Sequence, residues 1–262
     1  IASIAIAATL GNESLMFLPL SLATFGLFCS LIGIGIVRTQ VSRSPAVALR
    51  WGTFFSPVLF LVIAYFFIKY SPGIEIEVFY SVLTGAIGGM LIGLITEYYT
   101  GGSTENSPVG RIAKSGETGP ATVMITGLSV GMQSVVLPLF VIAAIIGIST
   151  HFSGLYGVGI AAVGMLATVG ITMAIDAYGP VADNAGGIAE MSGMKKEVRE
   201  ITDSLDELGN TTAAIGKGFA IGAAALAALA IIAAYMLATG IEYLSLNDPR
   251  VLMGIFIGGT IP

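Results

Sequence analysis

Acidic residues gather at the ends of two long apolar segments. Asp176, Asp183 and Glu190 follow one another at intervals of seven residues, and Glu97 closes an earlier apolar run. A spacing of seven places three side chains on one stripe of an α-helix, which Pro180 is expected to kink. Carboxylates at the edge of a membrane span are costly unless a metal, a partner or water stabilises them. These positions are therefore candidates for a binding site.

The next apolar segment begins with Asn210 and Lys217, which are again seven residues apart and share a helical face. If successive segments cross a membrane, both residues lie at the same boundary as Glu97 and Asp183. Oxygen ligands hold Mg²⁺, and an ammonium group neutralises phosphate oxygens. A helix N-terminus near Thr211 adds a favourable dipole for an anion. Together these residues predict a magnesium and phosphate site without naming its substrate.

Each of these residues also has a purely structural interpretation. Asn210 is a suitable N-cap, Glu97 suits a membrane interface, and Lys217 has a side chain long enough to reach the interface from within a span. Their convergence at one boundary is what favours a site.

The composition requires a lipid environment. Hydrophobic residues make up 55% of the 262 and charged residues only 10%, which is too apolar for a soluble domain of this size. The net charge of -5 excludes a nucleic-acid partner, because binding phosphate backbones needs clustered Lys and Arg. The single cysteine, Cys29, cannot form an intrachain disulfide.

We predict an all-α polytopic helix bundle that forms a single transmembrane domain over residues 1–262. A span needs about 20 apolar residues. Six segments qualify, and partial spans flank them at 1–10 and 250–262; the six are 15–37, 47–69, 77–98, 121–148, 155–178 and 211–238. Glycines four residues apart, such as Gly85 and Gly89 or Gly127 and Gly131, predict close helix packing.

Basic residues are unevenly divided between the two sides of this topology. One side has Lys69 and Arg250; the other has nine basic residues, namely Arg38, Arg43, Arg50, Arg111, Lys114, Lys195, Lys196, Arg199 and Lys217. The positive-inside rule makes the second side cytoplasmic. Residues 179–210 are then a cytoplasmic loop, and helical charge spacing within 194–208 predicts a short surface helix there.

Two common site types are excluded. Gly216-Lys217 suggests a phosphate-binding P-loop, but Thr211 replaces its first glycine and Gly218 its Mg²⁺-binding hydroxyl residue. His151 is the only histidine and falls in a predicted extracytoplasmic turn, so no site with several histidines exists within this sequence.

Segments 96–100, 176–191 and 209–222 resemble signature segments of the membrane-integral pyrophosphatases, in matching order and spacing. The resemblance implies a homodimer with sixteen spans per subunit in the cell membrane or the membrane of an acidic organelle. It also implies an active site that faces the cytoplasm, where pyrophosphate hydrolysis drives H⁺ or Na⁺ outward. Water attacks phosphorus directly in such a mechanism, without a phosphoenzyme.

The same resemblance implies roles for individual residues. Glu97 and Asp183 match carboxylates that bind Mg²⁺, and Asn210 and Lys217 match substrate contacts. Asp183 and Lys217 are accordingly the expected catalytic residues.

Four further positions match family motifs. Ala213 matches the position that is alanine in K⁺-dependent members and lysine in K⁺-independent ones, and Gly216 agrees with the K⁺-dependent pattern. K⁺ is therefore an expected cofactor beside Mg²⁺. Asp176 and Asn184 match motif positions whose individual roles are less defined.

The sequence begins at Ile1 without a methionine and ends within an apolar stretch, as expected of a fragment. Acidic segments typical of the family are absent, so we expect this fragment alone to be inactive. Two other functions remain open. In a secondary transporter, Asp176 and Asp183 would carry ions or a substrate; in a non-catalytic scaffold, the same small residues would serve only helix packing.

Overall fold

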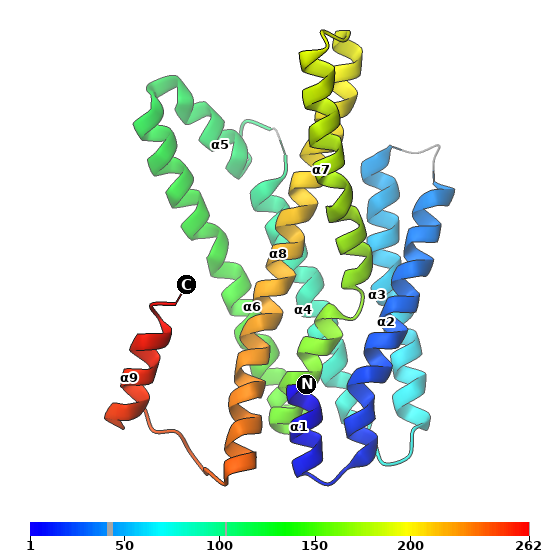
Figure 1. The fold of residues 1–262 in the computed structure, drawn as a ribbon, viewed down its shortest axis with the longest axis vertical. Coiled ribbons are helices and arrows are strands. Elements are labelled where there is room, and N and C mark those ends of the chain that lie inside the picture. Colours follow the sequence, from blue (N-terminus) through cyan, green and yellow to red (C-terminus); the bar gives the residue numbers. More distant parts are fainter. Residues whose placement is uncertain (41–43, 103, 262) are drawn as a thin grey trace.

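The computed structural model describes residues 1–40, 44–102 and 104–261, and every regular element in these ranges is a helix (Figure 1). Arg43, one of the basic residues assigned to the cytoplasmic side, lies outside them. The helices are α1 (Ala2–Thr9), α2 (Glu13–Thr39), α3 (Pro45–Tyr70), α4 (Glu77–Thr100), α5 (Pro108–Ser115), the 3₁₀ helix η1 (Gly116–Thr118), α6 (Pro120–Leu166), α7 (Val169–Met191), α8 (Lys196–Thr239) and α9 (Pro249–Gly258).

Five of these helices are long and apolar enough to cross a membrane, namely α2, α3, α4, α6 and α8. Large apolar side chains such as Phe28 on α2 and Phe140 on α6 are exposed on the protein surface, as lipid-facing residues are. Helices satisfy their own backbone hydrogen bonds, which lipid cannot do for them. The chain is therefore a multi-pass integral membrane protein, as predicted.

One predicted span is divided in the structure. Residues 155–178 do not form a single helix, because α6 bends at Ser153 and Gly154 and continues to Leu166 before α7 begins at Val169. Gly154 has φ +58°, a conformation that glycine adopts without a Cβ penalty. The expected kink at Pro180 does not interrupt α7, which runs on to Met191.

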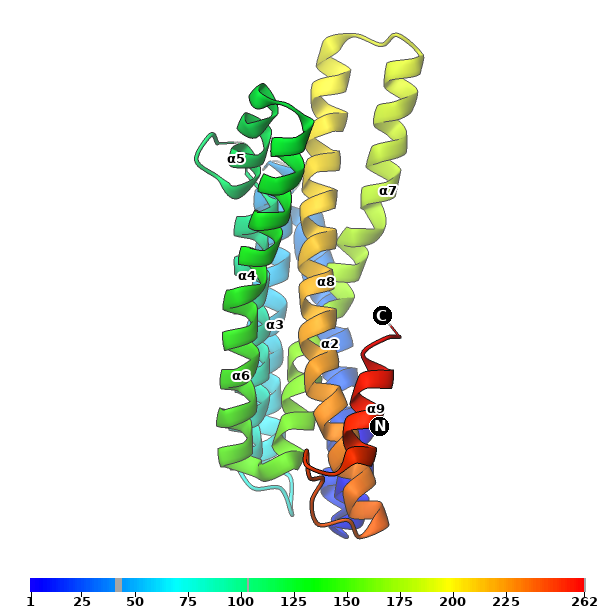
Figure 2. The same ribbon diagram turned by 90° about the vertical axis from the view of Figure 1, so that its left-hand side faces the viewer.

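Residues 179–210 differ from the predicted loop with a short surface helix. Helix α7 ends at Met191 and α8 begins at Lys196, so this segment is the tip of a helical hairpin that rises above the other helices (Figure 2). At the tip, Arg199 forms ion pairs with Glu190 at 2.8 Å and Asp203 at 3.3 Å. The charges at helical spacing therefore belong to an exposed extension of a long helix.

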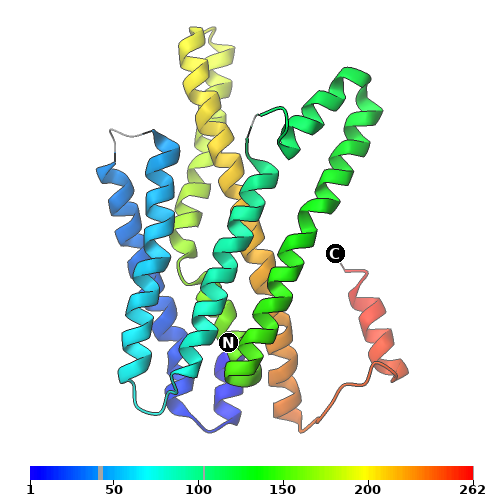
Figure 3. The ribbon, with the colours of Figure 1, turned by 180° about the vertical axis from the view of Figure 1, so that it is seen from behind.

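The distribution of basic residues assigned the segments between spans to two sides of the membrane. In the structure these two groups lie at opposite ends of the bundle (Figures 1 and 3). The C-terminal ends of α2 and α4, the N-terminal end of α3 and the α7–α8 tip share one end, which we call the upper end. The α1–α2, α3–α4 and α8–α9 connections lie at the other. The alternation of spans inferred from the sequence therefore agrees with the fold.

Glycines set the closest helix contacts. A Cβ on Gly85 of α4 would overlap the Ala161 carbonyl of α6, and a Cβ on Gly26 of α2 would overlap the Ala167 carbonyl between α6 and α7. The prediction of glycine packing is thus confirmed for Gly85. At Gly127 a Cβ would meet no atom of the described residues within 4 Å, so Gly127 makes no such close contact among them.

Replacing Gly85 with alanine should destabilise the protein by about 1–3 kcal/mol, because α4 and α6 must separate to accept the methyl group. Gly127→Ala is the matched control and should be neutral or stabilising by up to about 1 kcal/mol, since alanine favours helix and the site is open. Thermal unfolding of the purified full-length protein measures both. Equal midpoints for the two variants would contradict this account of the packing.

Candidate functional site

The predicted acidic stripe lies on one continuous helix. Because α7 runs unbroken from Val169 to Met191, Asp176, Asp183 and Glu190 share one face, and Asp183 is exposed. Each follows directly after a buried residue of the stripe formed by Ile175, Ala182 and Ala189. The acidic stripe therefore borders the packed face of α7.

Helix α8 presents a matching arrangement. Asn210 and Lys217 are both exposed, and each directly follows a buried glycine, Gly209 or Gly216. Asn210 Nδ2 donates a hydrogen bond to Asp206 Oδ2 at 3.1 Å within the helix. Among the described residues, Lys217 forms no ion pair, so its ammonium group is free to meet an anion.

Two glycines hold α7 and α8 together. A Cβ on Gly209 would come within 2.7 Å of the Gly179 Cα, so no side chain fits between the backbones at this crossing. Nearby, the Tyr178 hydroxyl donates to the Leu205 carbonyl at 2.9 Å, which fixes the register of the two helices.

This register spreads the predicted site along the hairpin. Gly216 lies against Thr172 and Met173, so its neighbour Lys217 is level with that part of α7. From Thr172 to Asp183 the helix rises about 16 Å, at 1.5 Å per residue. Asp183 and Lys217 thus lie at opposite ends of an elongated region rather than at a single point.

The remaining predicted positions lie in the same region. Asn184 Nδ2 donates to the Pro180 carbonyl at 2.6 Å within α7. Ala213 is partly buried on α8, and Gly216 is buried against Met173.

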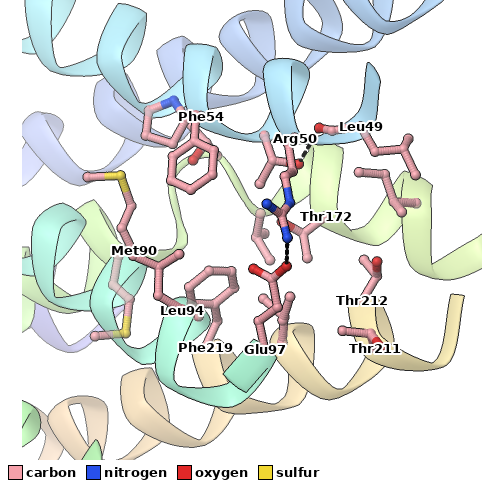
Figure 4. Close-up of a pocket in the computed structure, with 18 of the residues that line it drawn as sticks. Leu49, Arg50, Phe54, Met90, Leu94, Glu97, Thr172, Thr211, Thr212 and Phe219 are labelled. Carbon is pink, nitrogen blue, oxygen red and sulfur yellow. Dashed lines mark hydrogen bonds and ion pairs between the residues drawn. The ribbon is translucent and has the colours of Figure 1, made fainter. Parts of the chain in front are cut away.

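Glu97 lies on α4 in an ion pair with Arg50 of α3 (Figure 4), and it lines the same cavities as Leu208 and Thr211 of α8. The pair lines two neighbouring cavities. We call the outer one the vestibule; it has a volume of about 890 Å³, and Ser44, Thr104, Ser204 and Glu207 are among its lining residues. We call the inner one the chamber; it has a volume of about 100 Å³ and lies between α3, α4, α6, α7 and α8. Arg50 and Glu97 line both.

The described residues contain no group of three His, Cys, Asp or Glu side chains placed to hold a metal ion. Mg²⁺ in phosphate-transfer sites is often held by only one or two carboxylates together with substrate oxygens. The exposed Asp183 fits that mode. In this arrangement Arg50 pairs with one carboxylate oxygen of Glu97, so a bound Mg²⁺ would compete with Arg50 or use the second oxygen.

Sequence reasoning missed Arg50 as a partner of Glu97. The sequence shows Arg50 only as a basic residue near the start of a span. Nothing in the sequence relates it to Glu97, which lies 47 residues away. The threonines of the chamber were also missed, because hydroxyl side chains are common in membrane helices.

Comparison with known proteins identifies the family. The family described as "Inorganic H+ pyrophosphatase" matches residues 1–262. A protein of Clostridium tetani is 47% identical over 278 residues, which cover all of this chain and 40% of that relative.

Two further relatives have informative names. The "K(+)-stimulated pyrophosphate-energized sodium pump" of Thermotoga maritima is 39% identical over 95% of this chain. The "K(+)-insensitive pyrophosphate-energized proton pump" of Methanosarcina mazei is 42% identical over 93% of it. The chain spans 37% of the length of each of these two relatives. Because the family match extends over every residue, this chain belongs to the inorganic H⁺ pyrophosphatase family.

Proposed function

We propose that this chain is part of a membrane pump that hydrolyses pyrophosphate and uses the released free energy to move H⁺ or Na⁺ outward. The family match over residues 1–262 carries the proposal. The relatives are named both as sodium pumps and as proton pumps, so either ion is compatible with it. We further propose that the full-length protein is a homodimer in the cell membrane or an acidic organelle, with the upper end of the bundle facing the cytoplasm.

The substrate site is proposed to follow the polar stripes of α7 and α8. The Lys217 ammonium group neutralises phosphate oxygens, and the Asn210 amide contacts the substrate. Asp183 accepts a proton from the attacking water or holds Mg²⁺. When bound, Mg²⁺ would neutralise charge on the phosphates and polarise the phosphorus–oxygen bond that breaks. Asp176 and Asn184 are proposed to support the same site.

Replacing Asp183 or Lys217 with alanine should reduce pyrophosphate hydrolysis at least about a hundredfold, because each removes a charge that stabilises the transition state. Phosphate release from full-length protein in membranes measures the effect. Glu117→Gln, an exposed acid in η1, is the control and should keep full activity.

If wild-type protein that is correctly folded releases no phosphate from Mg²⁺-pyrophosphate, the pump proposal fails. Solute transport by that protein would then favour the secondary transporter. Full activity in both alanine variants would instead refute the assignment of the site to α7 and α8.

We propose that the pump requires K⁺, since position 213 is alanine. A lysine ammonium group at this position would replace a bound monovalent cation near the phosphates. Both K⁺-stimulated and K⁺-insensitive pumps occur among the relatives. For this chain, the proposal of K⁺ dependence therefore rests on residue 213.

Ala213→Lys should therefore remove the stimulation of hydrolysis by K⁺ while preserving activity in its absence. Rates measured with and without K⁺ at constant ionic strength test this, and Ala220→Lys, an exposed site on the same helix, is the control. An Ala213→Lys protein that still needs K⁺ would show that the cation acts elsewhere.

Glu97 remains a predicted Mg²⁺ ligand, and its pairing with Arg50 gives a test. If Mg²⁺ and Arg50 compete for this carboxylate, Arg50→Gln lowers the Mg²⁺ concentration for half-maximal hydrolysis and Glu97→Gln raises it. Lys114→Gln disrupts the exposed Lys114–Glu105 pair and should change neither. An unchanged Mg²⁺ requirement in both variants would contradict a role of Glu97 in binding Mg²⁺. Its role would then be limited to the ion pair with Arg50.

A further inference from the structure

Asp206 is an acidic residue of α8 that lies one helical turn before Asn210. Its Oδ2 atom accepts a hydrogen bond of 3.1 Å from Nδ2 of Asn210. In the described part of the chain Asp206 forms no ion pair, whereas Asp203, three residues earlier, pairs with Arg199 at 3.3 Å. The Asp206 carboxylate is therefore left to Asn210.

This hydrogen bond determines which way the Asn210 amide group is turned. An ionised carboxylate only accepts hydrogen bonds, so the amide nitrogen, and not the amide oxygen, must face Asp206. Asn210 is exposed, and an exposed side chain without a partner changes rotamer within nanoseconds. With the bond in place, the second N–H of the amide keeps one orientation and is available to a ligand.

Helix α7 holds the backbone around Asp206. The Tyr178 hydroxyl donates to the Leu205 carbonyl at 2.9 Å, and Gly209 packs directly against Gly179. These two contacts lie one residue before and three residues after Asp206, so this part of α8 cannot move independently of α7. A ligand-binding side chain is positioned precisely when the residue that orients it is itself held by packing and hydrogen bonds.

We propose that Asp206 is a positioning residue for Asn210, which it orients so that the free N–H of the amide donates to a phosphate oxygen of pyrophosphate. This inference rests on the proposed function, in which Asn210 contacts the substrate. Asp206 acts only through Asn210. Because the amide is oriented before the substrate arrives, less conformational freedom is lost on binding.

The negative charge of Asp206 makes this role distinguishable from a direct electrostatic one. A carboxylate near an anionic substrate repels it, so removal of the charge alone would lower the KM for pyrophosphate. Loss of the orientation of Asn210 would raise the KM. Asp206→Ala removes both the charge and the hydrogen-bond acceptor, whereas Asp206→Asn removes the charge but keeps an oxygen that accepts from Asn210.

Hydrolysis of Mg²⁺-pyrophosphate by the full-length protein in membranes tests the proposal. Asp206→Ala should raise the KM about three- to tenfold, as expected for one hydrogen bond, with little change in kcat. Asp206→Asn should keep the KM at or below that of the wild type. Asp203→Ala is the matched control, because it removes an acid of the same helix that does not contact Asn210, and it should leave the KM unchanged.

A double-mutant cycle then shows whether Asp206 acts through Asn210. Asn210→Ala should raise the KM, and adding Asp206→Ala to it should raise the KM no further. A further rise in the double variant, or an unchanged or lower KM in Asp206→Ala alone, would overturn the proposal, and so would equal losses in Asp206→Asn and Asp206→Ala. A wild-type KM in Asn210→Ala would instead refute the proposed substrate contact, and this inference with it.

Discussion

Helices in a bilayer gain little from burying apolar side chains against one another, because lipid is as apolar as leucine. They associate through close backbone contact, which requires residues without side chains at the crossing points. Gly85 against Ala161, Gly26 against Ala167 and Gly179 against Gly209 provide that contact here. These crossings fix the depth and rotation of every helix that carries a candidate site residue.

The crossing of α7 and α8 has the most direct consequence for function. If one helix slid past the other, a residue with a side chain would enter the contact between Gly179 and Gly209. The side chain would push the two backbones apart. The acidic stripe of α7 and the Asn210–Lys217 stripe of α8 therefore keep one relative position.

Much of the fold could be predicted from the sequence, because apolar runs of about 20 residues leave few alternatives in lipid. The division between α6 and α7 could not be predicted, since no charged residue or proline marks residues 165–168. The hairpin tip was assigned to a loop because residues 179–210 lie between two apolar segments, although the spacing of Asp176, Asp183 and Glu190 already indicated a helix over the first part. Periodicity identified the two polar stripes, but the Arg50–Glu97 pair joins residues from different helices that no local pattern relates.

The central claim is that pyrophosphate binds along the α7–α8 hairpin. A structure of the full-length protein with Mg²⁺ and a non-hydrolysable pyrophosphate analogue tests it most directly. The account predicts analogue density that contacts both Asn210 and Lys217 and reaches toward Asp183. Density confined to the vestibule, beside Arg50 and Thr104, would contradict it.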